Sequence, residues 1–371
     1  MRIGVPKEVK IHEYRVGLVP AGVRELVDRG HEVIVQSNAG LDIGIDDVTY
    51  QIAGAEIANN PADVFNWSDL IIKVKEPQSA ELGLIKKDQV IFTYLHLAAD
   101  AELTNSLIDS GCIAIAYETI TDEYGGLPLL SPMSEVAGRM SIQVGAHCLE
   151  REQGGAGILL GGVPGVSAAK VVILGGGVVG TNAALMAMGL SADVTVIDKS
   201  LPRLRELDIL FGSKLNTTFS TIESVEQAVA NADLVIGAVL VPGAASPKLI
   251  KRDLIKKMRA GSVVVDVAID QGGCFETSRP TTHEKPTFSV DGIIHYCVTN
   301  MPGAVARNST YALNNATLPY ILALADNGYV SALKDDMHFR SGLNIHKGQI
   351  THEAVAEALG YELQNSNVVL R

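Results

Sequence analysis

Residues 170–198 read KVVILGGGVVGTNAALMAMGLSADVTVID, and this stretch decides the fold. An apolar run is followed by Gly175, Gly177 and Gly180 in the spacing G-x-G-x-x-G, and a stretch rich in Ala and Met comes next. Asp198 ends a second apolar run, 23 residues after Gly175, where roughly 20 is typical. This order predicts a strand, a tight turn, a helix and a second strand, the unit that binds a dinucleotide in Rossmann-like domains.

Each glycine has a physical reason in such a unit. Gly175 would permit the tight turn, and Gly177 would let the backbone approach a pyrophosphate closely. Gly180 would let the helix pack on the strand, and the helix N-terminus would stabilise the phosphate charge. Asp198 can accept hydrogen bonds from ribose hydroxyls and would repel a 2′-phosphate, which favours NAD over NADP. Arg203 lies close enough in sequence to soften that preference, and a glycine-rich turn without a ligand is the alternative interpretation.

Outward from this unit, short apolar runs alternate with helical stretches along the whole chain. A first series of predicted strands lies at 2–6, 31–36, 69–75, 90–95 and 112–117. A second series lies at 171–174, 193–198, 233–240, 262–269 and 293–298. Such alternation is typical of parallel α/β sheets, so we expect an α/β fold with two Rossmann-like domains. A helix is predicted over 20–29, with Pro20 in its first turn and Gly30 at its end.

The joints between the domains are marked by proline and glycine. Pro128 and Pro132 precede Ser134-Glu135, a helix-start signal in which Ser134 would be the N-cap of a helix over about 135–152. The sequence NMPG at 300–303 breaks the second strand series. The tail has too few strands for a sheet of its own. We therefore expect a nucleotide-binding domain inserted into a substrate domain, with boundaries at 1–128, 129–306 and 307–371.

Composition and charge narrow the class of protein. The net charge of −12 gives no help in binding phosphate backbones, so nucleic acid is not an expected partner. The four cysteines form no C-x-x-C motif, which is typical of reduced thiols in the cytoplasm. The N-terminus lacks the apolar core of a signal peptide. Residues 171–192 are uncharged and long enough to span a bilayer, but three consecutive glycines favour a buried strand, turn and helix, so no membrane is expected.

Polar residues at strand ends suggest a second site. Ligands of parallel α/β sheets bind beyond the carboxyl ends of the strands. Lys75, His96 and Asp270 end or follow predicted strands, and Arg15 lies in the loop after the first strand. Arginine and lysine can bind a carboxylate, and histidine transfers protons near neutral pH, so a site for an amino or oxo acid is predicted if both sheets face one cleft. For each residue taken alone, an ordinary surface charge or a satisfied interior polar group is the favoured interpretation, and the histidine spacings predict no metal site.

The stretch GVPKEVKIHEYRVGLVPAGVRELVDRGHEV at 4–33 closely resembles the signature of the alanine dehydrogenase and transhydrogenase α-subunit family. Residues 170–198 resemble its second signature, and the resemblance covers essentially the whole chain. Two departures are His12, where the family commonly has asparagine, and Arg203, where lysine is frequent.

The resemblance implies an NAD-dependent dehydrogenase that interconverts L-alanine with pyruvate and ammonium and assembles as a homohexamer. In the substrate site, Arg15 and Lys75 would hold the carboxylate and carbonyl oxygen, His96 and Asp270 would be the acid/base residues, and Tyr94, Met133 and Met301 would line the pocket. The residues implied for NAD are Ser134, Gly175, Gly177, Val178, Val179, Gly180, Asp198, Arg203, Ser220, Val239, Leu240, Val267, Ala268, Ile269, Asp270, Arg279, Val298, Thr299, Asn300 and Met301. A lysine-forming saccharopine dehydrogenase and an NAD(H)-binding transhydrogenase subunit remain the alternatives.

Overall fold

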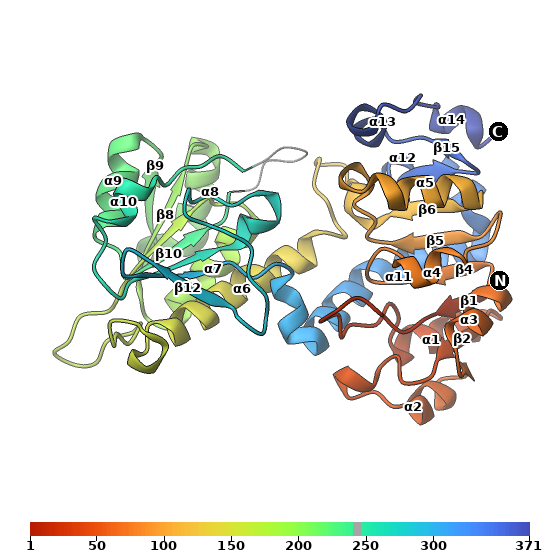
Figure 1. Cartoon of the computed structure of the whole chain (residues 1–371), viewed down its shortest axis with the longest axis horizontal. Helices are drawn as coiled ribbons and strands as arrows, with labels where there is room; N and C mark the ends of the chain where they lie inside the picture. Colours follow the sequence, from red (N-terminus) through yellow and green to blue (C-terminus); the bar gives the residue numbers. More distant parts are fainter. Residues whose placement is uncertain (240–245) are drawn as a thin grey trace. The chain divides into compact units, whose positions relative to one another are not determined.

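The computed structural model describes residues 1–239 and 246–371, which divide into two α/β units. Unit 1 comprises Met1–Met133 with Val305–Arg371, and unit 2 comprises Ser134–Ala304, so the chain of unit 2 interrupts that of unit 1. Each unit is built on one sheet flanked by helices (Figure 1). The predicted fold class of two Rossmann-like α/β domains is confirmed, with the addition of antiparallel strands at sheet edges.

The sheet of unit 1 has eight strands among the described residues. Their order across the sheet is β15 (Gln349–Ile350), β14 (Leu343–His346), β6 (Ile113–Ala116), β5 (Val90–Thr93), β4 (Leu70–Ile72), β1 (Arg2–Val5), β2 (Glu32–Gln36) and β3 (Glu56–Ala58). Strands β1 to β6 pair in parallel, whereas β14 runs antiparallel to β6 and β15 antiparallel to β14. The returning tail therefore extends the first sheet rather than forming another.

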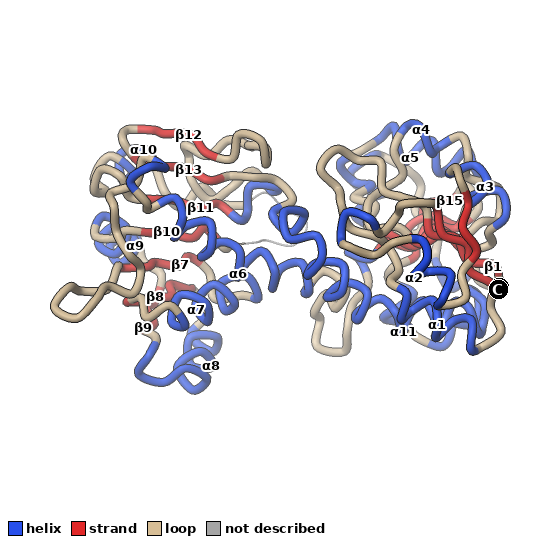
Figure 2. Tube along the Cα trace, turned by 90° about the horizontal axis from the view of Figure 1, so that it is seen from below, coloured by secondary structure: helices blue, strands red, loops and turns tan. Residues whose placement is uncertain are grey.

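Helices cover both faces of this sheet, with α3, α4 and α5 on one side and α1 and α11 on the other (Figure 2). The helices of unit 1 are α1 (Pro20–Asp28), α2 (Asp47–Ile52), α3 (Pro61–Trp67), α4 (Ser79–Leu82), α5 (Ala101–Ser110), α11 (Ala306–Asp335, interrupted at Gly328), α12 (Met337–Arg340), α13 (Glu353–Leu359) and α14 (Ser366–Val369), with 3-10 turns η1 (Leu41–Ile43), η2 (Leu97–Ala99) and η3 (Tyr117–Thr119). The predicted helix over 20–29 is confirmed as α1, which begins at Pro20.

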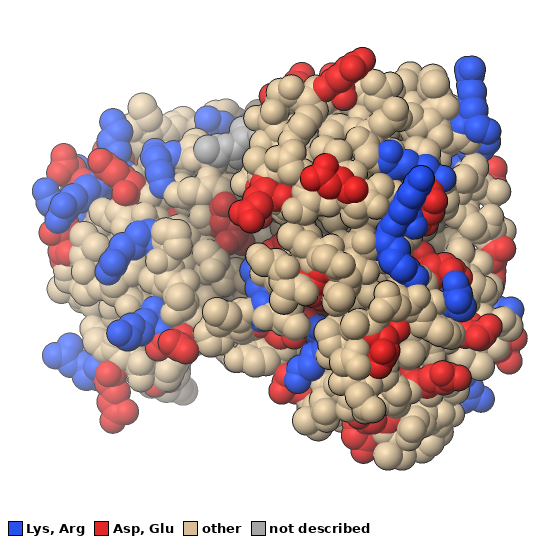
Figure 3. All heavy atoms as spheres, turned by 45° about the vertical axis from the view of Figure 1, so that its right-hand side comes forward, with Lys and Arg blue, Asp and Glu red and all other residues tan. Residues whose placement is uncertain are grey.

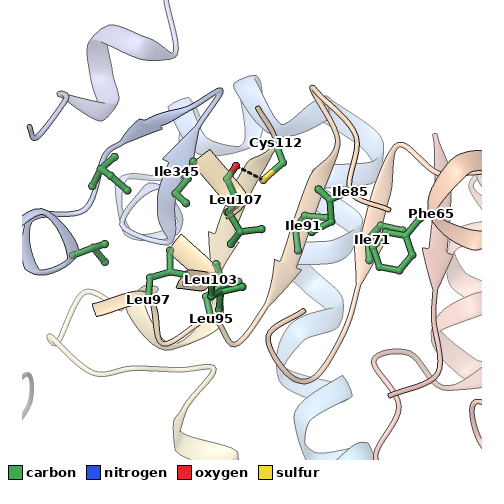
Figure 4. Packing of buried hydrophobic residues seen from close by; sticks show 14 of the residues in the cluster. Phe65, Ile71, Ile85, Ile91, Leu95, Leu97, Leu103, Leu107, Cys112 and Ile345 are labelled. Carbon is green, nitrogen blue, oxygen red and sulfur yellow. Dashed lines mark hydrogen bonds between the residues drawn. The ribbon is translucent and has the colours of Figure 1, made fainter. Parts of the chain in front are cut away.

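One buried apolar cluster fixes β4 and β5 from the side of α3 and α5. Phe65 of α3 packs near Ile71 of β4, and Leu103 of α5 lies next to Leu95, which follows β5 (Figure 4). Burying each such side chain contributes about 1.5–3 kcal/mol. The carboxyl ends of these strands are therefore a rigid base for the residues that follow them.

The sheet of unit 2 has seven strands among the described residues, parallel except for β12. Their order is β12 (Thr287–Val290), β13 (Ile293–Tyr296), β11 (Val263–Asp266), β10 (Leu234–Gly237), β7 (Lys170–Leu174), β8 (Asp193–Asp198) and β9 (Asn216–Phe219), as the tube view also shows (Figure 2). The helices are α6 (Ser131–Cys148, most of it in unit 2), α7 (Val178–Gly189), α8 (Leu201–Phe211), α9 (Ile222–Ala230) and α10 (Arg252–Ile255), with η4 (Arg151–Gln153), η5 (Gly212–Lys214), η6 (Val267–Gln271) and η7 (Met301–Val305). No helix among residues 1–239 and 246–371 is both long and apolar enough to cross a membrane.

Two local predictions are wrong. Helix α6 begins at Ser131, so Ser134 lies inside the first turn and is not the N-cap. Pro132 lacks an N–H and fits a first helical turn, and Ser131 already bonds to the carbonyl of Leu127 through its N–H and its hydroxyl. Asp270 does not end a strand either. Strand β11 stops at Asp266, and Asp270 follows it within η6.

The end of β11 has a physical cause. The Asp266 carboxylate, which is fully buried, accepts the backbone N–H of Cys274 at 2.9 Å and the hydroxyl of Ser278 at 2.5 Å. These bonds fold the following segment back against the strand end, so the chain leaves the extended conformation at once. Burial, partly offset by these hydrogen bonds, raises the pKa of Asp266.

Charged side chains are interspersed on the molecular face drawn in Figure 3, with Lys and Arg next to Asp and Glu. On that face the charges of both signs are mixed and form no large patch of one sign.

Candidate active site

Four neighbouring strands of unit 1 carry the site residues at their carboxyl ends. Arg15 follows β1, Lys75 follows β4, His96 follows β5 and Glu118 follows β6. Because these parallel strands lie in the order β6-β5-β4-β1, residues far apart in the sequence lie at one edge of the sheet. Arg15, Lys75 and His96, which were predicted to lie together, are thus all at this edge of the sheet in unit 1. Asp270, the fourth residue of the predicted group, belongs to unit 2.

Arg15 is buried and fixed by a paired carboxylate. Its Nε and Nη2 atoms each donate to Glu13 at 2.6 Å, and Nη1 lies 2.9 Å from the sulfur of Met133. Burial alone would raise the pKa of Glu13, but the hydrogen bonds and charge of Arg15 outweigh it and hold that pKa below its usual range. Burial would likewise lower the pKa of Arg15, and Glu13 reverses the sign. The guanidinium is therefore a permanent charge in one orientation.

Lys75 differs from Arg15 in the contacts of its charged group. Its backbone carbonyl accepts the hydroxyl of Thr93 at 3.0 Å, but within the part of the chain that the structure describes its ammonium has no hydrogen bond or ion pair. Burial, and after it the charge of Arg15, lowers the pKa of Lys75. A half-buried ammonium beside a second cation, without a protein partner, is suited to bind an anion.

His96 stands in a strained backbone conformation that Glu118 supports. Its φ is +53°, in the left-handed region that few non-glycine residues adopt. The Glu118 carboxylate accepts the backbone N–H of Leu95 at 3.1 Å and that of His96 at 2.6 Å, and lies 3.8 Å from Nδ1 of the ring. The imidazole stacks on Tyr94 with 6.0 Å between ring centroids and 4° between planes. The site therefore presents a half-exposed imidazole with a fixed ring plane.

Tyr94 is the buried aromatic side chain on which His96 stacks. It is buried, its hydroxyl donates to the carbonyl of Leu129 at 2.6 Å, and burial raises its pKa well above the usual range. The phenol is therefore neutral under ordinary conditions and serves as an apolar wall beside His96.

In unit 2 the glycine turn has the geometry that a dinucleotide requires. Gly175 has φ +99°, and a Cβ there would lie 2.7 Å from the carbonyl oxygen of Ala238. A Cβ on Gly180 would lie 1.8 Å from the carbonyl oxygen of Gly175, so α7 approaches the turn too closely for any side chain. A Cβ on Gly177 would meet no atom within 4 Å. The open space at Gly177, at the N-terminus of α7, fits the phosphates of a dinucleotide.

Asp198 and Arg203 both bind the glycine turn. The Asp198 carboxylate accepts the N–H of Gly176 at 2.6 Å and that of Ser200 at 2.8 Å. Arg203 donates from Nε to the carbonyl of Gly176 and from Nη2 to the hydroxyl of Thr181, both at 2.6 Å. Each carboxylate oxygen keeps a lone pair for a further donor, so the role expected of Asp198 toward a ribose is compatible with its role in shaping the turn.

The other predicted cofactor residues mostly follow strands of the second sheet. Val178 and Val179 begin α7, whereas Ser134 lies in α6, and Leu240 lies outside the described residues. Arg279 stacks on the ring of Phe288 in β12, with 4.4 Å from its guanidinium carbon to the ring centroid. The remaining members follow β9, β10, β11 and β13, in that order: Ser220; Val239; Val267, Ala268, Ile269 and Asp270; and Val298, Thr299, Asn300 and Met301.

Comparison with known families accounts for both units. Residues 4–137 match the model described as "Alanine dehydrogenase/PNT, N-terminal domain". Residues 141–353 match "Alanine dehydrogenase/PNT, C-terminal domain". The chain belongs to the alanine dehydrogenase/PNT family.

Individual relatives are similar over their full length. The chain is 61% identical to an alanine dehydrogenase of Halomonas elongata over 98% of both chains. It is 54% identical to the alanine dehydrogenase of Bacillus subtilis, over 98% of this chain and 96% of that protein. A solved structure of an L-alanine dehydrogenase superposes with a TM-score of 0.95 at 52% identity, covering 97% of this chain and 99% of the other. The resemblance seen in the sequence is therefore confirmed.

Within this family fold, sequence reasoning missed the carboxylates that hold the cations and the imidazole. Glu13 and Glu118 read equally well as ordinary loop charges, although Glu13 is buried and Glu118 bonds two backbone N–H groups. The closeness of Glu13 to Arg15 in sequence was a signal that could have paired them. Glu118 directly follows the predicted strand 112–117, the same signal that singled out His96, but its contact with His96 depends on β5 and β6 being neighbours.

Proposed function

We propose that this chain catalyses the reversible, NAD-dependent oxidative deamination of L-alanine to pyruvate and ammonium. The observation that carries the proposal is the pair of cations at one sheet edge, in a chain similar over its whole length to alanine dehydrogenases. Arg15 already has its carboxylate partner in Glu13, whereas the ammonium of Lys75 has none among the described residues. A small substrate with one carboxylate and a neighbouring carbonyl or amine matches that arrangement.

The two cations would divide the substrate between them. Lys75 would bind the carboxylate or carbonyl oxygen, and Arg15 would add a second positive charge whose orientation Glu13 and Met133 fix. Holding the carboxylate at defined points orients the bond from the α-carbon to its hydrogen, which is the bond that breaks. Tyr94 and Met133, both buried, would limit the pocket to small side chains.

His96 would move the proton. Loss of hydride from the α-carbon leaves an iminium ion, to which water adds, and the imidazole would take the proton of that water and return it to the leaving amine. Asp270 would assist at the amine. Acid/base catalysis of this kind contributes about 10²–10⁴-fold. The support of Glu118 and the stacking on Tyr94 favour this role, because they hold the ring in one plane.

The cofactor proposed for unit 2 is NAD, which accepts the hydride. Gly177 would face the pyrophosphate of NAD, and the open space at the turn supports this role. Asp198 would bind the adenosine ribose, because its carboxylate oxygens keep lone pairs for further donors. The residues after β9, β10, β11 and β13 would line the rest of the site, together with Arg203.

Assembly and location are proposed on the family resemblance and on the thiols. We expect a cytoplasmic homohexamer, and the four cysteines, all buried and free, agree with a reducing compartment. Light scattering on the purified protein tests the assembly, with about 236 kDa expected for six chains of 39.3 kDa.

One assay tests the function. Purified protein is mixed with NADH, ammonium and pyruvate, and NADH oxidation is followed by absorbance. The same protein is tested with 2-oxoglutarate and lysine, and with NADPH in place of NADH. We expect NADH to be oxidised with pyruvate and ammonium but not with 2-oxoglutarate and lysine. A Lys75→Met variant should lose the activity with pyruvate and ammonium. Activity only with 2-oxoglutarate and lysine, or none with any substrate pair, would refute the proposal.

A further inference from the structure

A buried group of three charges lies beneath the proposed substrate site. Lys73 is fully buried, and its ammonium lies 2.8 Å from Glu81 and 3.2 Å from Glu8, two carboxylates that are also buried. We call this group the Glu8–Lys73–Glu81 triad. Burial alone would lower the pKa of Lys73, but the two carboxylates reverse the sign and keep the ammonium charged. Such a triad is costly to desolvate, and apolar residues of similar volume are often as stabilising.

Each of the two carboxylates uses its second oxygen, which does not bind the Lys73 ammonium, to hold the backbone that follows β4. Oε1 of Glu8 accepts the N–H of Val74 at 2.7 Å and reaches that of Lys75 at 3.4 Å. Oε2 of Glu81 accepts the N–H of Gln78 at 2.9 Å, at the start of α4. The loop that contains Lys75 is therefore tied near both ends to two carboxylates, and the ammonium of Lys73 ties those carboxylates to each other.

Lys75 depends on this support more than its neighbours do. Arg15 is oriented by a direct ion pair of its side chain, whereas the ammonium of Lys75 has no such pair among the described residues. Its location is consequently set by its backbone, which Glu8 holds at the N–H and Thr93 holds at the carbonyl.

We infer that the Glu8–Lys73–Glu81 triad is a positioning device that sets the place of the Lys75 ammonium for the substrate carboxylate. This inference rests on the function proposed above. The triad does not contact the substrate and acts only through the loop. A positioning role of this kind gives the three buried charges a use besides stability, to which buried ionic groups often add little.

The test compares Glu8→Leu and Glu8→Gln with the unaltered protein. Hydrogen exchange is followed by mass spectrometry on peptides covering residues 74–78, and KM is measured for pyruvate and for NADH. In Glu8→Leu, exchange in these peptides should rise at least about tenfold and KM for pyruvate about tenfold, since a hydrogen bond to a charged acceptor is lost. KM for NADH should stay within about twofold, because unit 2 is unaltered. Glu8→Gln should lie between, because its amide oxygen can still accept from Val74.

Gln89→Leu is the matched control. Gln89 is buried in the same unit and donates to the carbonyls of Phe65 and Ser68, but it precedes β5 and so lies at the amino end of that strand. This variant should lower Tm without changing either KM. If Glu8→Leu fails to fold, Glu8→Gln decides the outcome by the same two measurements.

The outcomes separate the two proposals. A protein that does not turn over pyruvate refutes the proposed function, and faster exchange at 74–78 in the Glu8 variants would then still support the positioning of the loop. Unchanged exchange at 74–78 in both Glu8 variants would overturn the inference. An equal rise in KM for pyruvate in Gln89→Leu would overturn it as well, since loss of stability alone would then account for the effect.

Discussion

Gly180→Ala should destabilise unit 2, because the added methyl group would overlap the backbone of the glycine turn. The added Cβ would lie 1.8 Å from the carbonyl oxygen of Gly175, whereas ordinary contact begins at 3.4 Å. Helix α7 or the turn must therefore move by about 1.6 Å, and both are packed on the strand β7. Overpacking of this kind costs about 1–3 kcal/mol. For a unit of this size, a loss of about 2 kcal/mol lowers Tm by about 4–8 °C.

Two further glycines, at the two ends of the same helix, separate stability from cofactor binding. Gly177 has φ −67° and ψ −162°, which alanine can adopt, and its Cβ would meet no atom. Gly177→Ala should leave Tm within about 1 °C but raise the Kd for NADH at least about tenfold, because the methyl group would occupy the space proposed for the pyrophosphate. Gly189, the last residue of α7, also has open space around it. Gly189→Ala should raise stability by up to about 1 kcal/mol and leave NADH binding unchanged.

Differential scanning fluorimetry gives the three Tm values, and quenching of NADH fluorescence gives the three Kd values. The expected pattern is a low Tm for Gly180→Ala, a weak Kd at normal Tm for Gly177→Ala, and neither change for Gly189→Ala. A normal Tm in Gly180→Ala would show that the turn yields without cost. A normal Kd in Gly177→Ala would show that no ligand passes over this glycine.

Three more predictions concern charge and proton transfer. The pKa of Lys75 is lowered, so its positive charge is present at low pH and is lost as the pH rises through that pKa. In a series of KM measurements at different pH, KM for pyruvate should therefore begin to rise at a lower pH than the pKa of ~10.4 of an ordinary lysine. Lys75→Arg stays charged and should make KM for pyruvate less dependent on pH. His96→Ala should lower kcat by about 10²–10⁴-fold with NADH affinity retained, and near-normal turnover in stopped-flow assays would remove the imidazole from the mechanism. Asp198→Ala should lower the ratio of kcat/KM for NAD to kcat/KM for NADP, because the carboxylate proposed to bind the ribose is removed. It should also lower Tm, because the hydrogen bond from the Gly176 N–H is lost. An unchanged ratio would show that the carboxylate does not contact the ribose.

The sequence was informative about the fold where strands are buried on both faces. Strands such as β7 and β10 read as continuous apolar runs because both faces of the sheet are covered. Strands β9 (NTTF) and β12 (TFSV) were not predicted, since as edge strands they consist of exposed and half-buried residues and lack an apolar run. Strand β14 is fully buried but short, and its antiparallel partner β6 is remote in the sequence, so nothing local indicated the pairing.

For the site, the sequence located residues whose chemistry is conspicuous at strand ends. Lys75 and His96 were found because each follows an apolar run, although β4 and β5 end earlier than predicted. Asp270 was chosen by the same rule, yet the acidic residue that ends β11 is Asp266. A rule based on apolar runs cannot see that a buried carboxylate turns the chain, because the partners of that carboxylate lie eight and more residues further on.

The contrast between the two cations explains how the site can bind an anion without rearranging its own ion pairs. Arg15 is already paired with Glu13, so a substrate carboxylate would add to that pair and not replace it. Lys75 is half-buried and has been partly stripped of water by folding, and its lowered pKa reflects this loss. Part of the desolvation of the ammonium has therefore occurred before the substrate arrives, so binding an incoming carboxylate costs correspondingly less in lost hydration. The Lys75 ammonium must then be held in place without an ion-pair partner among the described residues, which is the role we propose for Glu8 and Glu81.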